Sequence, residues 1–151
     1  MNHALAAKAY AKVGLETGVS SADPHRLIMM LYDGAILSIN QAQGHLQARN
    51  LARKGEATSK AIQIIEEGLR ASLDRKVGGA IAMQLDSLYE YMCQRLLLAN
   101  VGNDPIGFAE VGRLLCDLRD AWASLGEKDA VGKPRLASPA PSGGQPALRT
   151  A

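Results

Sequence analysis

Apolar residues recur along this chain with the period of an α-helix, whereas the alternation of apolar and polar residues that is typical of a strand never persists. The first periodic stretch begins at Asp23-Pro24, a strong helix start because Asp caps backbone N–H groups and Pro suits the first helical position. It continues into the forties, where Gly44 weakens it. One face of this helix is apolar and is expected to face a core: Leu27, Ile28, Leu31, Ala35, Ile39 and Ala42.

Three further helices follow the same pattern. The second is predicted over about 52–73, and Gly78-Gly79 separates it from a third over about 79–101. Asp104-Pro105 repeats the helix start, and the fourth helix is expected to end at about Leu125. Four helices of similar length with short connections predict an all-α fold, an antiparallel four-helix bundle. The predicted core faces are Leu51, Thr58, Ile62, Ile65, Leu69 and Leu73 in the second helix, Ile81, Leu85, Leu88, Met92, Leu96 and Ala99 in the third, and Val111, Leu114, Leu115, Leu118, Trp122 and Leu125 in the fourth.

The chain is expected to divide into three parts. Residues 1–23 form a mobile N-terminal cap segment with a short amphipathic helix, whose apolar positions include Tyr10 and Val13. Residues 24–125 form the bundle. Residues 126–151 hold four of the six prolines together with Gly, Ser and Ala, a composition that predicts a disordered tail.

Several helices carry more apolar surface than one core needs. In the first helix Met29 and Ile36 project away from the core face and Met30 and Leu37 flank them, while Tyr91 and Leu98 share one line of the third. The second has a stripe of small residues that permits close approach of another helix: Ala57, Ala61, Ile64, Gly68 and Ala71. Each feature could also serve a neighbouring bundle helix or a homodimer. Together they favour grooves for amphipathic segments of another chain.

Composition and charge reduce the number of function classes that fit this sequence. The formal net charge is +2, and the four basic and two acidic residues of 126–151 leave 13 residues of each sign in the rest of the chain. A neutral body disfavours a nucleic-acid partner. The sequence contains neither an 18-residue apolar run nor a signal peptide, so we expect no membrane span and a cytoplasmic location. Cys93 and Cys116 are expected to be buried and reduced, although their spacing leaves a disulfide open.

The sequence contains no pattern of residues that is typical of a catalytic, cofactor-binding or metal site. The three histidines lack ligand spacing with carboxylates, and Gly78-Gly79 lacks the Lys-Ser/Thr of a phosphate loop. Lys54 and its neighbouring arginines, and Glu66-Glu67, are interpreted as solvated charge. We therefore expect a binding protein and not an enzyme, with neither cofactor nor metal.

Several short motifs occur in a characteristic order and spacing between Ala9 and Trp122, over nearly the whole predicted body. They are Ala9-Tyr10, Pro24 with Leu31-Tyr32-Asp33-Gly34-Ala35, Lys54-Gly55-Glu56, Leu73-Asp74 with Gly78-Gly79, Leu88-Tyr89-Glu90-Tyr91-Met92, Arg95-Leu96, Ala99-Asn100, Asp104, and Leu118-Arg119-Asp120-Ala121-Trp122. Taken together, these motifs resemble the flagellin-specific export chaperones of the FliS family. Asp23 stands where the family usually has a small hydroxyl residue, which preserves helix capping.

This resemblance implies a cytoplasmic chaperone that binds the C-terminal region of flagellin, prevents premature polymerisation and assists delivery to the flagellar type III export gate. It implies that the client wraps around the bundle, and that the Tyr10 segment caps a groove in the free protein. An export-gate subunit is a further possible partner, and a homo-oligomeric bundle without a flagellin client is the alternative. Tyr32 and Tyr89 could also be core residues, and Asp33 could bond to client backbone. The expected partner-binding residues are Tyr10, Met29, Met30, Tyr32, Ile36, Leu37, Ile64, Tyr91, Leu98 and Asn100.

Overall fold

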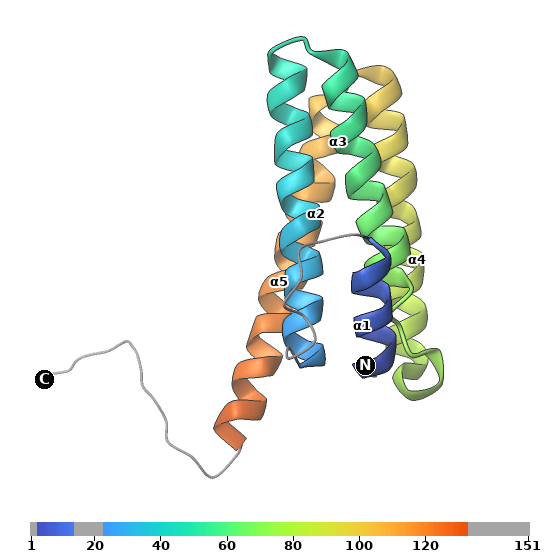
Figure 1. The fold of residues 1–151 in the computed structure, drawn as a ribbon, viewed down its shortest axis with the longest axis vertical. Helices are drawn as coiled ribbons and strands as arrows, with labels where there is room; N and C mark the ends of the chain where they lie inside the picture. Colours follow the sequence, from blue (N-terminus) through green and yellow to red (C-terminus); the bar gives the residue numbers. More distant parts are fainter. Residues whose placement is uncertain (1–2, 14–22, 133–151) are drawn as a thin grey trace, which may run out of the picture.

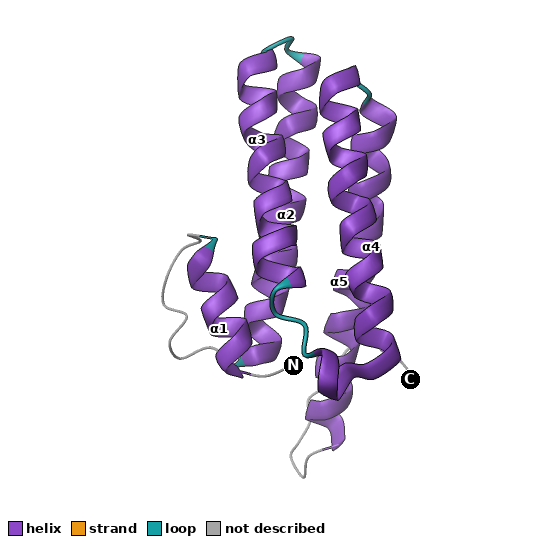
Figure 2. Cartoon of the chain, turned by 90° about the vertical axis from the view of Figure 1, so that its right-hand side faces the viewer, coloured by secondary structure: helices purple, strands orange, loops and turns teal. Residues whose placement is uncertain are grey.

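The computed structural model describes residues 3–13 and 23–132. Over these residues the elements are the helices α1 (His3–Lys12), α2 (Pro24–Gln47), α3 (Leu51–Gln63), η2 (Ile64–Arg70), α4 (Arg75–Gly102) and α5 (Pro105–Gly132). The ribbon alternates in direction through α2, the continuous α3–η2, α4 and α5, with α1 packed at one end (Figures 1 and 2). The prediction of an antiparallel four-helix bundle with a short N-terminal helix is confirmed.

Polar residues define where the long helices begin. Asp23 Oδ1 accepts a hydrogen bond from the backbone N of Arg26 at 2.7 Å, and Asp104 Oδ1 accepts one from that of Ile106 at 2.9 Å. Each side chain satisfies an N–H group that the first helical turn leaves without a partner. Asn50 and Asp74 act in the same way at the starts of α3 and α4.

Two predicted boundaries differ from the structure, whereas α2 ends at Gln47, in the forties as predicted. The third bundle helix begins at Arg75 and not at about residue 79, with Gly79 as a kink inside it. The helix predicted to end at about Leu125 continues to Gly132, so the first residues assigned to the tail are helical. Residues 14–22 and 133–151 lie outside the described part, and the mobility and disorder expected there stay predictions.

The second bundle helix changes from α-helical to π-helical at Ile64. The change places Gly68 against two other elements: a Cβ on Gly68 would lie 2.8 Å from Leu31 Cδ2 of α2 and 3.4 Å from Val13 Cγ1, just beyond α1. A side chain at this position would require the Leu31 side chain to shift. For Gly68, the small-residue stripe therefore serves neighbours within the same chain.

Helix α1 is docked on the bundle along α2 and η2. Its apolar face is buried, with Tyr10 3% and Val13 1% exposed. Lys60 Nζ donates a hydrogen bond to the Val13 carbonyl at 2.8 Å, which ties the C-terminal end of α1 to α3. The expected amphipathic cap helix is therefore present and covers apolar surface of the bundle.

The core lies along the bundle axis and includes most of the predicted apolar faces, such as Met92, Leu96 and Ala99 of α4. At its centre the Tyr32 and Tyr89 hydroxyls form a hydrogen bond of 2.6 Å that joins α2 to α4. The predicted core faces include residues at their ends that the structure leaves exposed. Ile81 is 67% exposed, and Leu51 and Leu125 are each 51% exposed. Among the described residues, no helix is long and apolar enough to cross a membrane.

Candidate partner-binding surface

Helix α4 presents apolar side chains to solvent along much of its length. Among the described residues its outward face has no neighbouring element, because α3, η2 and α5 flank its inner side. Soluble monomers rarely leave contiguous apolar surface of this kind uncovered, so the face is a candidate interface. The exposed large apolar residues of this face are Met83, Tyr91, Leu97, Leu98 and Val101 of α4. Val77, Ile81 and Ile106 are also exposed, and the first two line the pocket between α4 and α5.

A polar cluster fixes Tyr91 on this face. The Tyr91 hydroxyl donates to Glu110 Oε2 at 2.5 Å, and Arg95 Nε donates to the other carboxylate oxygen of Glu110 at 2.7 Å. The carboxylate acceptor stabilises the phenol proton and raises the pKa of Tyr91. The same two donors lower the pKa of Glu110, the Tyr91 bond contributing most. Tyr91 is therefore held in one orientation while the residue stays 44% exposed.

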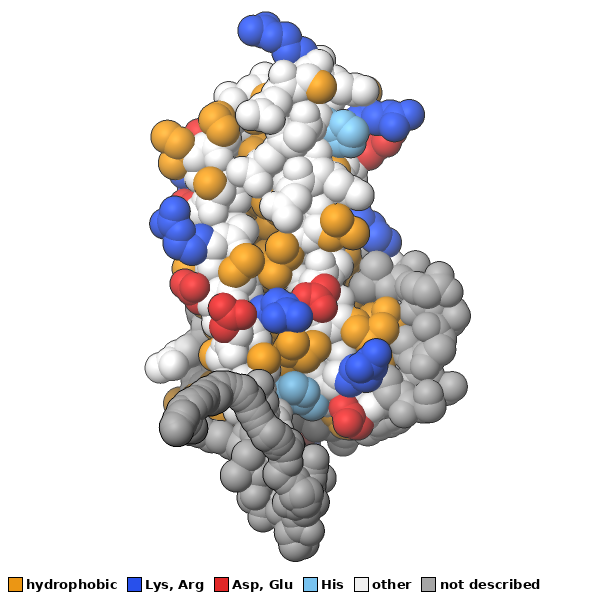
Figure 3. All heavy atoms as spheres, turned by 90° about the vertical axis from the view of Figure 1, so that its left-hand side faces the viewer, with side chains coloured by type: hydrophobic (Ala, Val, Ile, Leu, Met, Phe, Trp, Pro, Cys, Tyr) orange, Lys and Arg blue, Asp and Glu red, His pale blue; other side chains and the backbone are white. Residues whose placement is uncertain are grey.

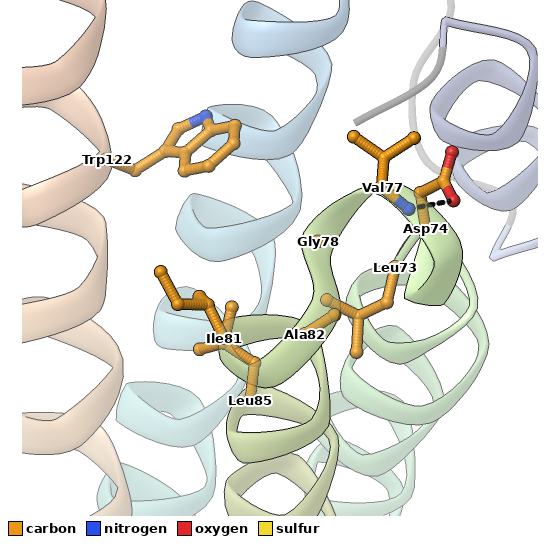
Figure 4. Close-up of a pocket in the computed structure, with 8 residues that line it drawn as sticks. All are labelled: Leu73, Asp74, Val77, Gly78, Ile81, Ala82, Leu85 and Trp122. Carbon is orange, nitrogen blue, oxygen red and sulfur yellow. Dashed lines mark hydrogen bonds between the residues drawn. The ribbon is translucent and has the colours of Figure 1, made fainter.

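A pocket opens between the N-terminal part of α4 and the C-terminal half of α5 (Figure 4). Its cavity is about 130 Å³, its lining is mainly apolar, and Trp122 points across it from α5 toward α4. Gly79, with φ +54°, redirects the first turn of α4 at this point, a conformation that favours glycine. The lining residues are Leu73, Asp74, Val77, Gly78, Ile81, Ala82, Leu85 and Trp122.

Contacts with α2 hold the indole of Trp122. Its ring stacks on that of His25, with centroids 5.4 Å apart and planes 9° apart. Trp122 Nε1 donates to the His25 carbonyl at 3.1 Å, and His25 Nε2 lies 2.6 Å from the Trp122 carbonyl. A Cβ on Gly126 would lie 2.3 Å from the His25 ring, so this glycine makes room for the stack. The contacts with His25 thus fix the orientation of the indole that lines one side of the pocket.

The predicted partner-binding residues do not form one patch. Leu37, Tyr91 and Leu98 are exposed, while Met29, Met30, Ile36 and Asn100 are half-buried. Helices α2 and α4 lie diagonally across the bundle, so their outward faces point in opposite directions. On the side that carries α2 and α5, hydrophobic side chains alternate with charged ones (Figure 3). A single compact partner cannot cover both faces, whereas a chain that wraps around the bundle can.

The other three predicted contacts are buried. Tyr32 is 3% exposed and bonded to Tyr89 in the centre of the bundle, which matches the alternative interpretation of both as core residues. Burial raises the pKa of both phenols and is the largest influence on each of them. Tyr10 and Ile64 are buried in the region where α1 meets η2. A partner could reach them only if α1 moved.

The side chains of three residues interpreted as solvated or client-binding have partners within the chain. Lys54 is buried, not solvated: its Nζ donates to the Asn100 carbonyl at 2.7 Å and to Asn103 Oδ1. Asp33 forms an ion pair with Arg119 of α5. Glu66 forms an ion pair with Arg70 at 3.0 Å, so it is not simply solvated charge. The Asn100 side-chain oxygen is buried and accepts no hydrogen bond from the described residues.

The cysteines behave differently from each other. Cys93 is half-buried, and burial raises the pKa of its thiol to about 12, so the reactive thiolate is scarce at neutral pH. Cys116 is exposed, contrary to the expectation of burial, and both thiols are free. Within residues 3–13 and 23–132, no group of three or more His, Cys, Asp and Glu side chains is placed to hold a metal ion.

Sequence reasoning missed the pocket, because Ile81, Leu85 and Trp122 were all assigned to the core. Periodicity places these residues on the inner faces correctly, but the helices diverge at this end of the bundle. The one available signal was Gly78-Gly79, which marks a break in the third helix beside them.

The fold and this surface define a class: a helical-bundle protein with unpartnered apolar surface, suited to binding segments of another chain. Residues 6–129 match the family described as Flagellar protein FliS. The chain therefore belongs to the FliS family of flagellar secretion chaperones, and the resemblance seen in the sequence is confirmed.

Relatives in distant bacteria cover most of the chain. The flagellar secretion chaperone FliS of Salmonella typhimurium is 48% identical over 121 residues, which are 80% of this chain and 90% of that protein. FliSB of Pseudomonas aeruginosa is 44% identical over 120 residues, 80% of this chain and 94% of the relative. FliS of Bacillus subtilis is 36% identical over 107 residues, with coverage of 71% and 78%.

Proposed function

We propose that this protein is a cytoplasmic chaperone that binds the C-terminal region of flagellin, keeps it from polymerising prematurely, and presents it to the flagellar type III export apparatus. Membership of the flagellar secretion chaperone family supports the general role. The observation that carries the proposal is the uncovered apolar face of α4, which a folded monomer has no reason of its own to expose.

The energetics favour a partner that covers this face. Met83, Leu98 and Val101 are each at least 65% exposed. Burying a side chain of this kind contributes about 1.5–3 kcal/mol, so three such contacts supply several kcal/mol toward the entropy cost of ordering a partner segment. Amphipathic helical segments with apolar residues every three or four positions match a face of this shape.

The position of the contacts favours an extended client. The outward faces of α2 and α4 lie on opposite sides, and each carries partly or fully exposed predicted contacts, such as Leu37 and Leu98. A disordered segment that folds as it binds can cross from one face to the other and bury a large surface. Displacement of α1 would add the apolar groove that now holds Tyr10.

Calorimetric titration with a peptide spanning the C-terminal region of flagellin tests the proposal. We expect a one-to-one complex with a large negative heat-capacity change, because apolar surface is buried and the peptide folds. Leu98→Asp should weaken binding at least about tenfold, since it removes an apolar contact and places a charge in the interface. Ser124→Asp adds the same charge on the exposed outer side of α5 and serves as the matched control.

Absence of both heat and co-elution would reject flagellin as the client. Sedimentation of the protein alone would then examine the alternative, in which the same apolar face joins copies of this chain into a homo-oligomer. A dimer that persists on dilution and is disrupted by Leu98→Asp would favour that alternative.

A further inference from the structure

No side chain of the described residues fills the pocket between α4 and α5. Its volume, about 130 Å³, and its apolar lining suit one branched aliphatic side chain. Asp74 is the only charged residue in the lining. Asp74 Oδ1 accepts from the backbone N of Lys76 and Val77 at the start of α4, and within the described residues the carboxylate forms no ion pair.

We propose that Leu148 of this same chain occupies the pocket when no partner is bound, with Arg149 pairing with Asp74. Among residues 133–151, which lie outside the described part, Leu136 and Leu148 are the only large aliphatic residues. The same segment holds three basic residues and no acidic one, and Arg149 directly follows Leu148. An aliphatic residue beside a cation matches an apolar pocket with a single carboxylate at its edge.

Chain length selects Leu148 over Leu136. The ten residues from Trp122 to the end of α5 at Gly132 rise about 15 Å along the helix axis. Leu136 lies four residues further on, a reach of at most about 14 Å for a chain that must also reverse direction, so it falls short of the indole. Leu148 is sixteen residues from Gly132 and spans up to about 55 Å, which leaves ample length.

The local sequence lowers the cost of docking. Pro146 lies two residues before Leu148 and restricts its own backbone, so fewer conformations are lost when the segment is ordered. Tethering also places the segment near the pocket at an effective concentration of about a millimolar, so that even a weak contact is populated.

The consequence for the chaperone rests on the proposed function. A client segment that uses the pocket must displace Leu148, and its apparent affinity falls in proportion to the fraction of protein whose pocket is open. The residues matched to the FliS family end at 129, so the segment that supplies this competitor lies outside the matched region. Regulation by Leu148 would thus be a property of this chain.

Fluorescence of the full-length chain tests the proposal without any client. Trp122 is the only tryptophan and lines the pocket, so its quenching by acrylamide reports on access to it. We expect Leu148→Asp to raise the quenching constant at least about 1.5-fold with an unchanged circular dichroism spectrum. Leu136→Asp, the same change in a similar Pro-x-Leu context, should leave quenching at the wild-type value.

Equal quenching of wild type and Leu148→Asp would overturn the proposal, as would an equal rise for both variants. Protection that disappears on dilution would assign the pocket to a second copy of the chain and would also overturn it. Titration with the flagellin peptide separates the two proposals: Leu148→Asp should bind several-fold more tightly than wild type. If Leu148 protects Trp122 but no variant binds the peptide, the proposal that Leu148 occupies the pocket is supported and the proposal of a flagellin client is rejected.

Discussion

The hydrogen bond between Tyr32 and Tyr89 offers the sharpest test of how the bundle is held together. The two oxygens are 2.6 Å apart, and the side chains are 3% and 0% exposed. Replacing either residue by Phe removes one hydroxyl and leaves the other buried without this partner. An unsatisfied buried hydroxyl costs about 1–3 kcal/mol, so we expect each single variant to lose about 2 kcal/mol of unfolding free energy.

The double variant should lose little more unfolding free energy than either single variant. Two phenylalanines leave no hydroxyl to satisfy, and their rings keep the packing of the tyrosines. The singles, taken independently, would sum to about 4 kcal/mol, whereas we expect the double to lose about 2 kcal/mol, a coupling of about 2 kcal/mol between α2 and α4.

Urea unfolding followed by circular dichroism at neutral pH measures all four corners of this double-mutant cycle. Burial raises the pKa of both phenols, so neither ionises under these conditions. Tyr91→Phe is the matched control: its hydroxyl bonds to Glu110 at the surface, and we expect a loss below about 0.5 kcal/mol. Additive losses for Tyr32 and Tyr89 would refute the reasoning, because they would show that the two hydroxyls do not depend on each other.

Three further predictions follow from contacts between helices. Gly126→Ala should displace the His25 ring and lower stability by about 1 kcal/mol, since two hydrogen bonds and a stack outweigh the better helix propensity of Ala; the Trp122 emission spectrum should shift with it. Gly68→Ala should separate η2 from Leu31 and Val13 and speed amide exchange in α1, whereas Gly44→Ala, in open space, should not. Asp86→Asn should cost about 1 kcal/mol at pH 7, because its bonds to Arg70 and Arg75 lower the pKa of Asp86. A lowered carboxyl pKa stabilises the fold above the unfolded-state pKa, so the difference between Asp86→Asn and wild type in urea unfolding should vanish as the pH falls through the folded-state value.

Periodicity predicted the bundle because core burial is repeated along whole helices. In α2, buried apolar residues recur at helical spacing from Leu27 to Ala42, about four turns. Asp23 and Asp104 mark helix starts by capping chemistry that operates within a few residues. Such signals are local. They survive whatever tertiary arrangement follows, which is why the element order could be obtained from the sequence.

Features that depend on where two helices stop could not be obtained in this way. Ile81 and Leu125 have the same spacing as their buried neighbours, but they lie at the ends of their predicted core faces and are 67% and 51% exposed. The π-helical turn at Ile64–Arg70 also has no simple sequence signature, although Gly68 hinted at close packing. Lys54 was misjudged because its partners, Asn100 and Asn103, are distant in sequence.

The same limit explains why contact residues are harder to assign than core residues. A helix face with apolar residues every three or four positions is identical in sequence whether its neighbour is another bundle helix, α1, or a segment of a second protein. Tyr10 illustrates the case of α1, which covers a groove within its own chain, whereas nothing in the described residues covers Leu98. Only the three-dimensional arrangement separates them: faces on diagonal helices cannot share one compact ligand, so the residues predicted on α2 and α4 require a partner that is extended.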